Sequence, residues 1–180
     1  MNSHPKDDPV ETTIQYEYAP LDPRSRQIRL VTLLPGNWQD DIHCEMTTVK
    51  FGKRMPKYET LSYVWGDPTT TRGIWVNDQI FSVGENLWIA LRRLRNPQSL
   101  RFLWIDAICI NQQDDNEKSK QVAMMRDIFE SCDEVICWLG EGGTIASHTI
   151  SSLPPTSVAS QQAFQSIQMY ASDASLDHIT

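Results

Sequence analysis

The nearly continuous apolar run FLWIDAICI, residues 102–110, constrains the fold more than any other feature of this chain. Such a run is typical of a strand that is buried on both faces of a sheet, with helices on either side. Asp106 is the one charged residue within it. Because burying an unpaired charge is costly, Asp106 is either a structural residue that bonds backbone amides or an arginine, or a polar group that reaches a functional site.

The segments around this run alternate between β-prone and helical patterns. The expected strands are 28–34, 42–49 as an edge strand, 60–65, 102–110 and 134–140. The segment 73–83 has the pattern of a β-hairpin about Asn77-Asp78. Helices are expected over 85–95 and 114–132, from apolar residues at helical spacing. The buried side of the second helix is expected to consist of Val122, Met125, Phe129 and Cys132.

This order of elements predicts an α/β fold with a mainly parallel sheet flanked by helices and an inserted β-hairpin. In particular, 102–110 and 135–139 should be adjacent parallel strands, because a single helix joins them. In such folds, ligands bind beyond the carboxyl ends of the strands and near helix N-termini.

Composition and charge exclude several classes of protein. A net charge of −7 and a pI near 5.0 oppose a general binder of nucleic acid or anionic membranes. The four cysteines form no CxxC pair, so we expect no disulfide framework and no metal site. The polar N-terminus excludes a secretory signal, and no apolar run approaches the roughly 20 residues of a membrane span. A cytoplasmic protein is expected.

The chain divides into three parts by composition. Residues 1–15 are expected to form a flexible arm, 16–143 the folded domain, and 144–180 a Ser/Gln-rich tail that is largely disordered or holds one short helix. That helix would lie around 159–170, where apolar residues recur at helical spacing. Both terminal parts should add little to stability, since they offer few apolar groups to bury.

Three blocks resemble the fungal heterokaryon-incompatibility (HET) domain family. They are YEYAPLDPRSRQIRLVTLLPG (16–36), YETLSYVWGDP (58–68) and LWIDAICINQQDDNEKSKQVAMMRDIFESCDEVICWLG (103–140). The resemblance implies a role in non-self recognition, a form of innate immunity that triggers programmed cell death when incompatible hyphae fuse. The partners it implies are other HET-domain or incompatibility proteins, including copies of the same chain.

The HET family is also distantly similar to TIR domains, which have a flavodoxin-like fold and of which some cleave NAD. This similarity implies an alternative function, a NAD-cleaving hydrolase with Glu117 as the key carboxylate and NAD as substrate. No cofactor is expected otherwise. The chain has no GxGxxG, P-loop or GxSxG motif, so no established catalytic motif supports an enzyme.

Glu117 and Asp106 are the candidate catalytic residues. Glu117 is expected in the first helical turn after a buried strand, beside the apolar face marked by Met124 and Ile128. A partly desolvated carboxylate there could act as a general base or stabilise a ribosyl cation. Alternatively, Glu117 completes a capping box with Asp114, and Glu117→Gln then leaves the melting curve unchanged.

Polar residues that follow two of the expected strands are candidates for lining a ligand pocket. The candidates are Ser62, Trp65, Gly66, Asp67, Asn111 and Gln112. Trp65 could stack on a nucleotide base, whereas the alternative is that Trp65 belongs to the core and Gly66-Asp67 to a turn. Asn111 and Gln112 either line the same pocket or merely complete a strand-to-helix loop.

Overall fold

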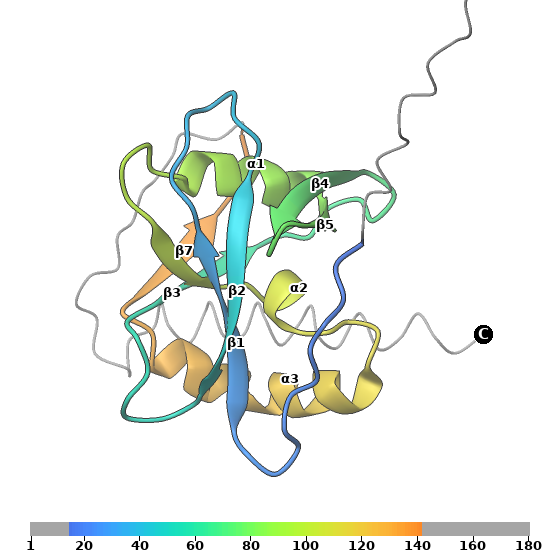
Figure 1. The fold of residues 1–180 in the computed structure, drawn as a ribbon, viewed down its shortest axis with the longest axis vertical. Helices are drawn as coiled ribbons and strands as arrows, with labels where there is room; N and C mark the ends of the chain where they lie inside the picture. Colours follow the sequence, from blue (N-terminus) through green and yellow to red (C-terminus); the bar gives the residue numbers. More distant parts are fainter. Residues whose placement is uncertain (1–14, 142–180) are drawn as a thin grey trace, which may run out of the picture.

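Strand β1 (Gln27–Leu33) lies at the centre of the sheet, and its residues 28–33 are all buried. The computed structural model describes residues 15–141, in which seven strands form one sheet in the order β5-β4-β2-β1-β6-β3-β7 (Figure 1). The other strands are β2 (His43–Lys50), β3 (Glu59–Tyr63), β4 (Thr71–Val76), β5 (Gln79–Gly84), β6 (Arg101–Trp104) and β7 (Glu134–Trp138). The helices are α1 (Glu85–Leu94), α2 (Asp106–Cys109) and α3 (Asp115–Glu130).

The predicted α/β class is confirmed, but the expectation of a mainly parallel, flavodoxin-like sheet is wrong. β1 is antiparallel to both of its neighbours, β2 and β6, and β4 is antiparallel to β5. Parallel pairing joins β2 to β4, and β3 to β6 and β7. Residues 34–42 alone connect β1 to β2, which is too short for the crossover that parallel neighbours need.

The expected strand 102–110 is divided between β6 and the helical turn α2. Its core residues Ile105, Ile108 and Cys109 are fully buried, as the apolar run predicts. The backbone turns there because the N–H of Cys109 donates to the carbonyl of Ile105 at 2.7 Å. A short apolar run indicates burial, but it does not distinguish a strand from a buried helical turn.

Strands β6 and β7 are parallel but are not adjacent, because β3 lies between them. Helix α3 crosses β3 before the chain enters β7. The hydroxyl of Tyr58, just before β3, donates to the carbonyl of Ile128 in α3 at 2.6 Å. The chain therefore returns on the far side of β3. Strand β2, expected at an edge, is interior, since it pairs with β1 along its length and with β4 at His43 and Cys44.

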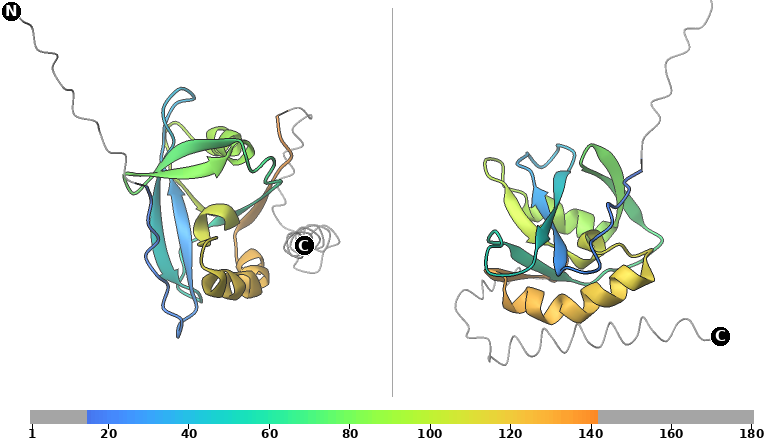
Figure 2. Two further views of the ribbon diagram at one scale, coloured as in Figure 1. Left: turned by 90° about the vertical axis from the view of Figure 1, so that its right-hand side faces the viewer. Right: turned by 60° about the horizontal axis from the view of Figure 1, so that its bottom comes forward.

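The predicted hairpin and the helices predicted over 85–95 and 114–132 are confirmed. Asn77 and Asp78 have φ of 49° and 61°, the left-handed conformation of a two-residue type I′ turn between β4 and β5. Helix α1 packs beside this hairpin through its buried Leu87, Ala90 and Leu91, whereas α3 runs along the other end of the molecule and α2 lies between them (Figures 1 and 2).

Met125, Phe129 and Cys132 of the predicted buried side of α3 pack partly against the core, but the helix is rotated so that its most buried side lies next to them. Its fully buried residues are Gln121 and Ile128, and Val122 is 43% exposed. The rotation follows from polar contacts that bind the helix to β1. The side-chain amide of Gln121 donates to the carbonyl of Gln27 at 2.8 Å, and Glu117, one turn earlier, bonds to Arg29.

Most of the predicted arm and tail lies outside the described residues. Of residues 1–15, only Gln15 is described, and it bridges to Ile80 of β5. The predicted helix at 159–170 lies beyond residue 141. Among residues 15–141, no helix is long and apolar enough to span a membrane.

Candidate functional site

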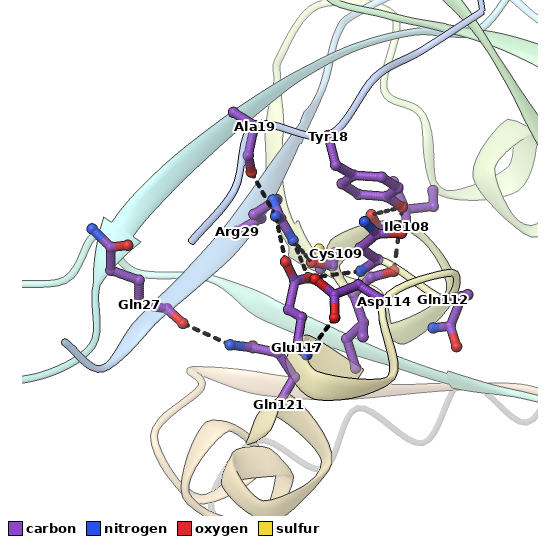
Figure 3. A network of polar contacts seen from close by, with 12 residues as sticks. Tyr18, Ala19, Gln27, Arg29, Ile108, Cys109, Gln112, Asp114, Glu117 and Gln121 are labelled. Atoms are coloured by element: carbon purple, nitrogen blue, oxygen red, sulfur yellow. Dashed lines mark hydrogen bonds and ion pairs between the residues drawn. The ribbon is translucent and has the colours of Figure 1, made fainter. Parts of the chain in front are cut away.

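Arg29 is a charged side chain at the centre of the buried sheet, and Glu117 of α3 neutralises it. Nη1 and Nη2 of Arg29 lie 2.6 and 2.9 Å from the two carboxylate oxygens of Glu117 (Figure 3). The same nitrogens donate to the carbonyls of Cys109 and Ala19 at 3.0 and 2.7 Å. Only 2% of the Arg29 side chain and 9% of the Glu117 side chain are exposed. This bidentate, charge-assisted pair holds β1, α3 and the end of α2 together.

The start of α3 is capped by Asp114, not by Glu117. Asp114 Oδ1 accepts the backbone N–H groups of Asn116 and Glu117 at 3.0 and 3.1 Å. Oε1 of Glu117 instead accepts the N–H of Asn111 at 2.8 Å, in addition to its bond with Arg29. Both oxygens of Glu117 are thus bonded to donors of the protein itself. This geometry makes Glu117 a structural counter-charge, and its expected catalytic role stays a prediction.

Tyr18 completes the network from the N-terminal segment. Its ring centroid lies 4.8 Å from Cζ of Arg29, and its hydroxyl donates to the carbonyl of Ile108 at 2.8 Å. Burial raises the pKa of the Tyr18 phenol well above its ordinary value. Neither Arg29 nor Tyr18 stands out as a site residue in the sequence. The one available signal is the arginine inside the apolar strand IRLVTLL, since a charge there needs a buried partner.

Asp106 begins α2, and its carboxylate faces Trp65. Oδ2 accepts the indole N–H of Trp65 at 3.2 Å, and Oδ1 accepts the N–H of Ala107 at 2.7 Å. Burial raises the pKa of Asp106 to about 6, and the two hydrogen bonds oppose this rise only in part. Trp65 is 50% exposed. The carboxyl ends of β3 and β6 thus hold a desolvated carboxyl group beside a partly exposed aromatic ring.

The loop residues near Asp106 mainly stabilise the loop itself. The side-chain amide of Gln112 donates to the carbonyl of Asp106 at 3.1 Å, and the side-chain oxygen of Asn111 accepts the N–H of Gln113 at 3.1 Å. These contacts agree with the simpler expectation of a strand-to-helix loop. Gln112 is the one residue of this loop whose side chain bonds to Asp106.

The residues after β3 form a turn. Gly66 has φ of 77°, a conformation that favours glycine. Asp67 Oδ1 accepts the N–H and the hydroxyl of Thr69 at 2.8 and 2.7 Å, and these bonds lower the pKa of Asp67. Ser62 is half-buried within β3. The predicted alternative to a ligand pocket is a turn at Gly66-Asp67 with Trp65 in the core. The turn is present, but Trp65 is not a core residue.

The two candidate carboxylates do not meet in one hollow. Within residues 15–141, no hydrogen bond joins Glu117 to Asp106, and each has its own set of partners. A shallow hollow of about 350 Å³ lies at the other ends of β3, β6 and β7, and the candidate residues are not among its lining. It is lined by Lys57, Tyr58, Glu59, Leu100, Arg101, Phe102, Asp133 and Glu134. The described part of the chain has no group of His, Cys, Asp and Glu able to hold a metal ion.

Comparison with known proteins identifies the family. The sequence pattern described as "Heterokaryon incompatibility protein (HET)" matches residues 58–178. This chain belongs to the HET family. Heterokaryon incompatibility protein 6, OR allele, of Neurospora crassa is 40% identical to this HET chain over 139 residues, which cover 69% of the chain and 20% of the Neurospora protein. No solved structure matches this chain.

The matched region of the HET chain contains the second and third blocks of the predicted resemblance, while the first block precedes it. Trp65, Asp106 and Glu117 therefore lie inside the family pattern, whereas Arg29 lies outside it. The chain spans about a fifth of the length of the curated relative that it matches. The similarity to TIR domains is not tested by these matches and stays a prediction.

Proposed function

We propose that this HET domain is an interaction module of the fungal incompatibility response, which promotes cell death by contacting other HET-type proteins. The observation that carries the proposal is an apolar patch at the carboxyl ends of β3 and β7, formed by Val64, Trp65 and Leu139. Their exposed fractions are 53%, 50% and 79%. Single exposed apolar residues are common on soluble proteins, but neighbouring ones are typical of interaction surfaces.

The register of the sheet places Val64 beside Leu139, and Trp65 is the next residue after Val64. Tyr63 and Trp138 form the last pair of the parallel strands β3 and β7, and Val64 and Leu139 follow them directly. The hydrogen bond to Asp106 holds the indole of Trp65 in one orientation although half of its surface is exposed. An aromatic side chain that is ordered before binding loses little conformational freedom on contact with a partner, which favours it as an anchor.

Family membership and the name of the Neurospora relative support the incompatibility role of this proposal. Self-association of the chain is one form of the proposed HET–HET contact. The proposal places the protein in the cytoplasm. A formal net charge of −7 gives it no general attraction to nucleic acid or anionic membranes.

Two leucines at opposite ends of the sheet provide a matched test. Leu139→Asp places a charge in the patch, and Leu100→Asp places the same charge at a residue that is 47% exposed beside the hollow at the other end. We expect Leu139→Asp to abolish co-precipitation of differently tagged copies, or of an incompatibility partner, and to relieve growth arrest in a filamentous fungus. Leu100→Asp should do neither. Equal behaviour of the two variants would refute the patch as the contact surface.

The NAD-cleaving alternative gains no support from the contacts of Glu117, whose two oxygens are bonded to Arg29 and to the N–H of Asn111. Incubating the purified chain with NAD tests it directly. We expect no release of nicotinamide above the spontaneous rate. Release that follows the protein concentration would instead favour the enzyme, and Asp106, beside the exposed ring of Trp65, would then be the first residue to replace.

A further inference from the structure

Helix α3 carries a second apolar stripe, next to the side that faces the sheet. Val122 is 43% exposed, and Met125 and Phe129 are half-buried. Their spacing of three and four residues aligns them along one side of the helix. The adjacent side, with Gln121 and Ile128, is fully buried. Met125 and Phe129 pack partly against the core, where the ring of Phe129 meets that of Trp104 edge to face, so the exposed part of the stripe is Val122 together with the outer parts of these two side chains.

Strand β7 extends this stripe. Val135 and Cys137 are the parallel partners of Thr60 and Ser62, so these residues share one face of the sheet. That face is the one next to α3, because Thr60 Oγ1 lies 3.4 Å from Sγ of Cys132, just beyond the end of α3. Val135 is half-buried and Cys137 is exposed. We call the area formed by Val122, Met125, Phe129, Val135 and Cys137 the α3–β7 surface.

The α3–β7 surface lies beside a sheet edge. In the described part of the chain, β7 pairs with β3 alone. Natural sheets usually cover such an edge, because an open strand next to apolar side chains favours aggregation. Helix α1 contacts β7 on the opposite face of the sheet. Trp138 follows Cys137 in the strand and so points to that face, where its indole N–H donates to the side chain of Asn86 at 2.8 Å. The α3–β7 surface thus lacks an equivalent helical cover from residues 15–141.

The chain itself continues from this edge. The match to the HET family extends to residue 178, well past the last described residue, 141. Residues 159–170 (ASQQAFQSIQMY) contain no charged side chain, and Ala163, Phe164, Ile167 and Tyr170 recur at helical spacing. The intervening residues 142–158 are long enough to reach any point of the α3–β7 surface, since an extended chain spans about 3.3 Å per residue.

We propose that residues 159–170 dock on the α3–β7 surface through this apolar side and complete the HET domain. The family match supports this occupant, because a segment that belongs to the family pattern is expected to serve the domain itself. The docked segment would shield Cys137, which offers a chemical readout within the full chain. It would also make the C-terminal part stabilising, contrary to the expectation from its composition alone.

The test compares alkylation of Cys137 by iodoacetamide, followed by mass spectrometry, in the full-length chain and two variants. Phe164→Asp places a charge on the apolar side, and Gln165→Asp places the same charge on the opposite side of the predicted helix. Phe164→Asp should raise the alkylation rate about tenfold, the equivalent of about 1.4 kcal/mol of docking free energy, and lower the thermal midpoint. Gln165→Asp should change neither.

Val122→Asp tests the same contact from the other side, at a position exposed enough to tolerate the charge. It should raise the alkylation of Cys137 as Phe164→Asp does. Two results would overturn the proposal. One is a rate that is the same in Phe164→Asp and in the unchanged chain. The other is protection of Cys137 from alkylation in the unchanged chain that is lost when the protein is diluted. Such protection would come from a second copy of the chain bound to the α3–β7 surface.

Discussion

Arg29 and Glu117 show how one buried ion pair can determine the placement of three elements. Removing two charges from water costs several kcal/mol, and the attraction within the pair offsets that cost only when the geometry is good and the remaining donors and acceptors are bonded. Here both guanidinium nitrogens that face Glu117 also bond carbonyls, and Asn111 donates to the carboxylate. One buried donor, Nε of Arg29, lacks a partner among the described residues. The pair therefore specifies how β1 and α3 meet more than it adds to stability.

Replacing Glu117 by glutamine should destabilise the fold strongly. The amide side chain would keep the shape of the carboxylate, but Arg29 would remain buried without a counter-charge, which costs about 3–5 kcal/mol. Urea unfolding measures the loss. Glu85→Gln is the matched control, because the Arg72–Glu85 pair has side-chain exposures of 55% and 40% and should contribute no more than about 1 kcal/mol. Equal losses in the two variants would contradict the structural role of Glu117.

This prediction corrects the expectation that Glu117→Gln leaves the melting curve unchanged. That expectation assumed that Glu117 completes a capping box with Asp114, whereas Asp114 caps the helix as expected and Glu117 bonds to Arg29 and to the N–H of Asn111. Loss of growth arrest in Glu117→Gln therefore cannot separate catalysis from unfolding. Leu139→Asp, at a residue that is 79% exposed, is the better functional probe.

Asp106 should make stability depend on pH in the direction opposite to a salt-bridged carboxylate. Burial raises its pKa from 3.8 to about 6, so the folded state binds the proton more tightly than the unfolded state. The contribution of Asp106 to the free energy of unfolding then falls as the pH rises from about 4 to about 6, by at most about 3 kcal/mol. Asp106→Asn removes this titration. The thermal midpoint of the variant minus that of the unchanged chain should increase between pH 4 and 7, and a flat or falling difference would contradict the burial of the charge.

At the scale of the elements, the hairpin of β4 and β5 follows local turn chemistry. Asn77 and Asp78 both have left-handed backbones, and the side chain of Asn77 also accepts the N–H of Met46 at 2.9 Å. The turn thus joins the hairpin to β2, and Asn77 cannot be exchanged freely. Asp78 has no such contact among the described hydrogen bonds, so its backbone conformation is the main constraint at that position.

Asp78→Gly should stabilise the chain by about 0.5–1 kcal/mol, because glycine adopts the left-handed conformation of a type I′ turn without strain. The midpoint of urea unfolding should rise at an unchanged slope. Asp78→Val is the control at the same position, and a β-branched residue at positive φ should lower the midpoint. A glycine variant no more stable than the unchanged chain would show that Asp78 makes a contribution beyond its backbone.

At the scale of the whole molecule, the order of the strands determines which backbone groups open first. β1 and β6 have strands on both sides, whereas β5 and β7 lie at the two edges of the described sheet. Local opening exposes edge amides at a lower free energy than central ones. The strand order thus predicts a gradient of protection from β1 outward.

Amide hydrogen exchange measures this gradient. Amides of β1 that bond to β2 and β6 should exchange slowest, and those of β5 and β7 should exchange faster by on the order of a hundredfold. Protection should continue from β6 into α2, because the N–H groups of Ile108, Cys109 and Ile110 are hydrogen-bonded and these residues are buried. Exchange in β1 as fast as in β5 and β7 would contradict the central position of β1.

Features that depend on neighbours along the chain could be predicted from the amino-acid sequence. The spacing of Leu87, Ala90 and Leu91 predicted α1, Asn77-Asp78 predicted the hairpin, and the blocks at 58–68 and 103–140 predicted the HET family. Hydrophobic period and turn residues encode such elements locally, so no tertiary information is needed to read them.

Features that join distant residues emerged only in the folded molecule. Arg29 and Glu117 are separated by 88 positions, and Trp65 and Asp106 by 41, and no local pattern encodes either pairing. The apolar run at 102–110 indicated burial, which a strand and a helical turn satisfy equally. The position of β1 beside β6 also depends on residues that are far apart, because Val31 pairs with Leu103. These contacts pair buried charges and backbone groups that lie far apart in the chain, and such pairs exist only once the elements are assembled.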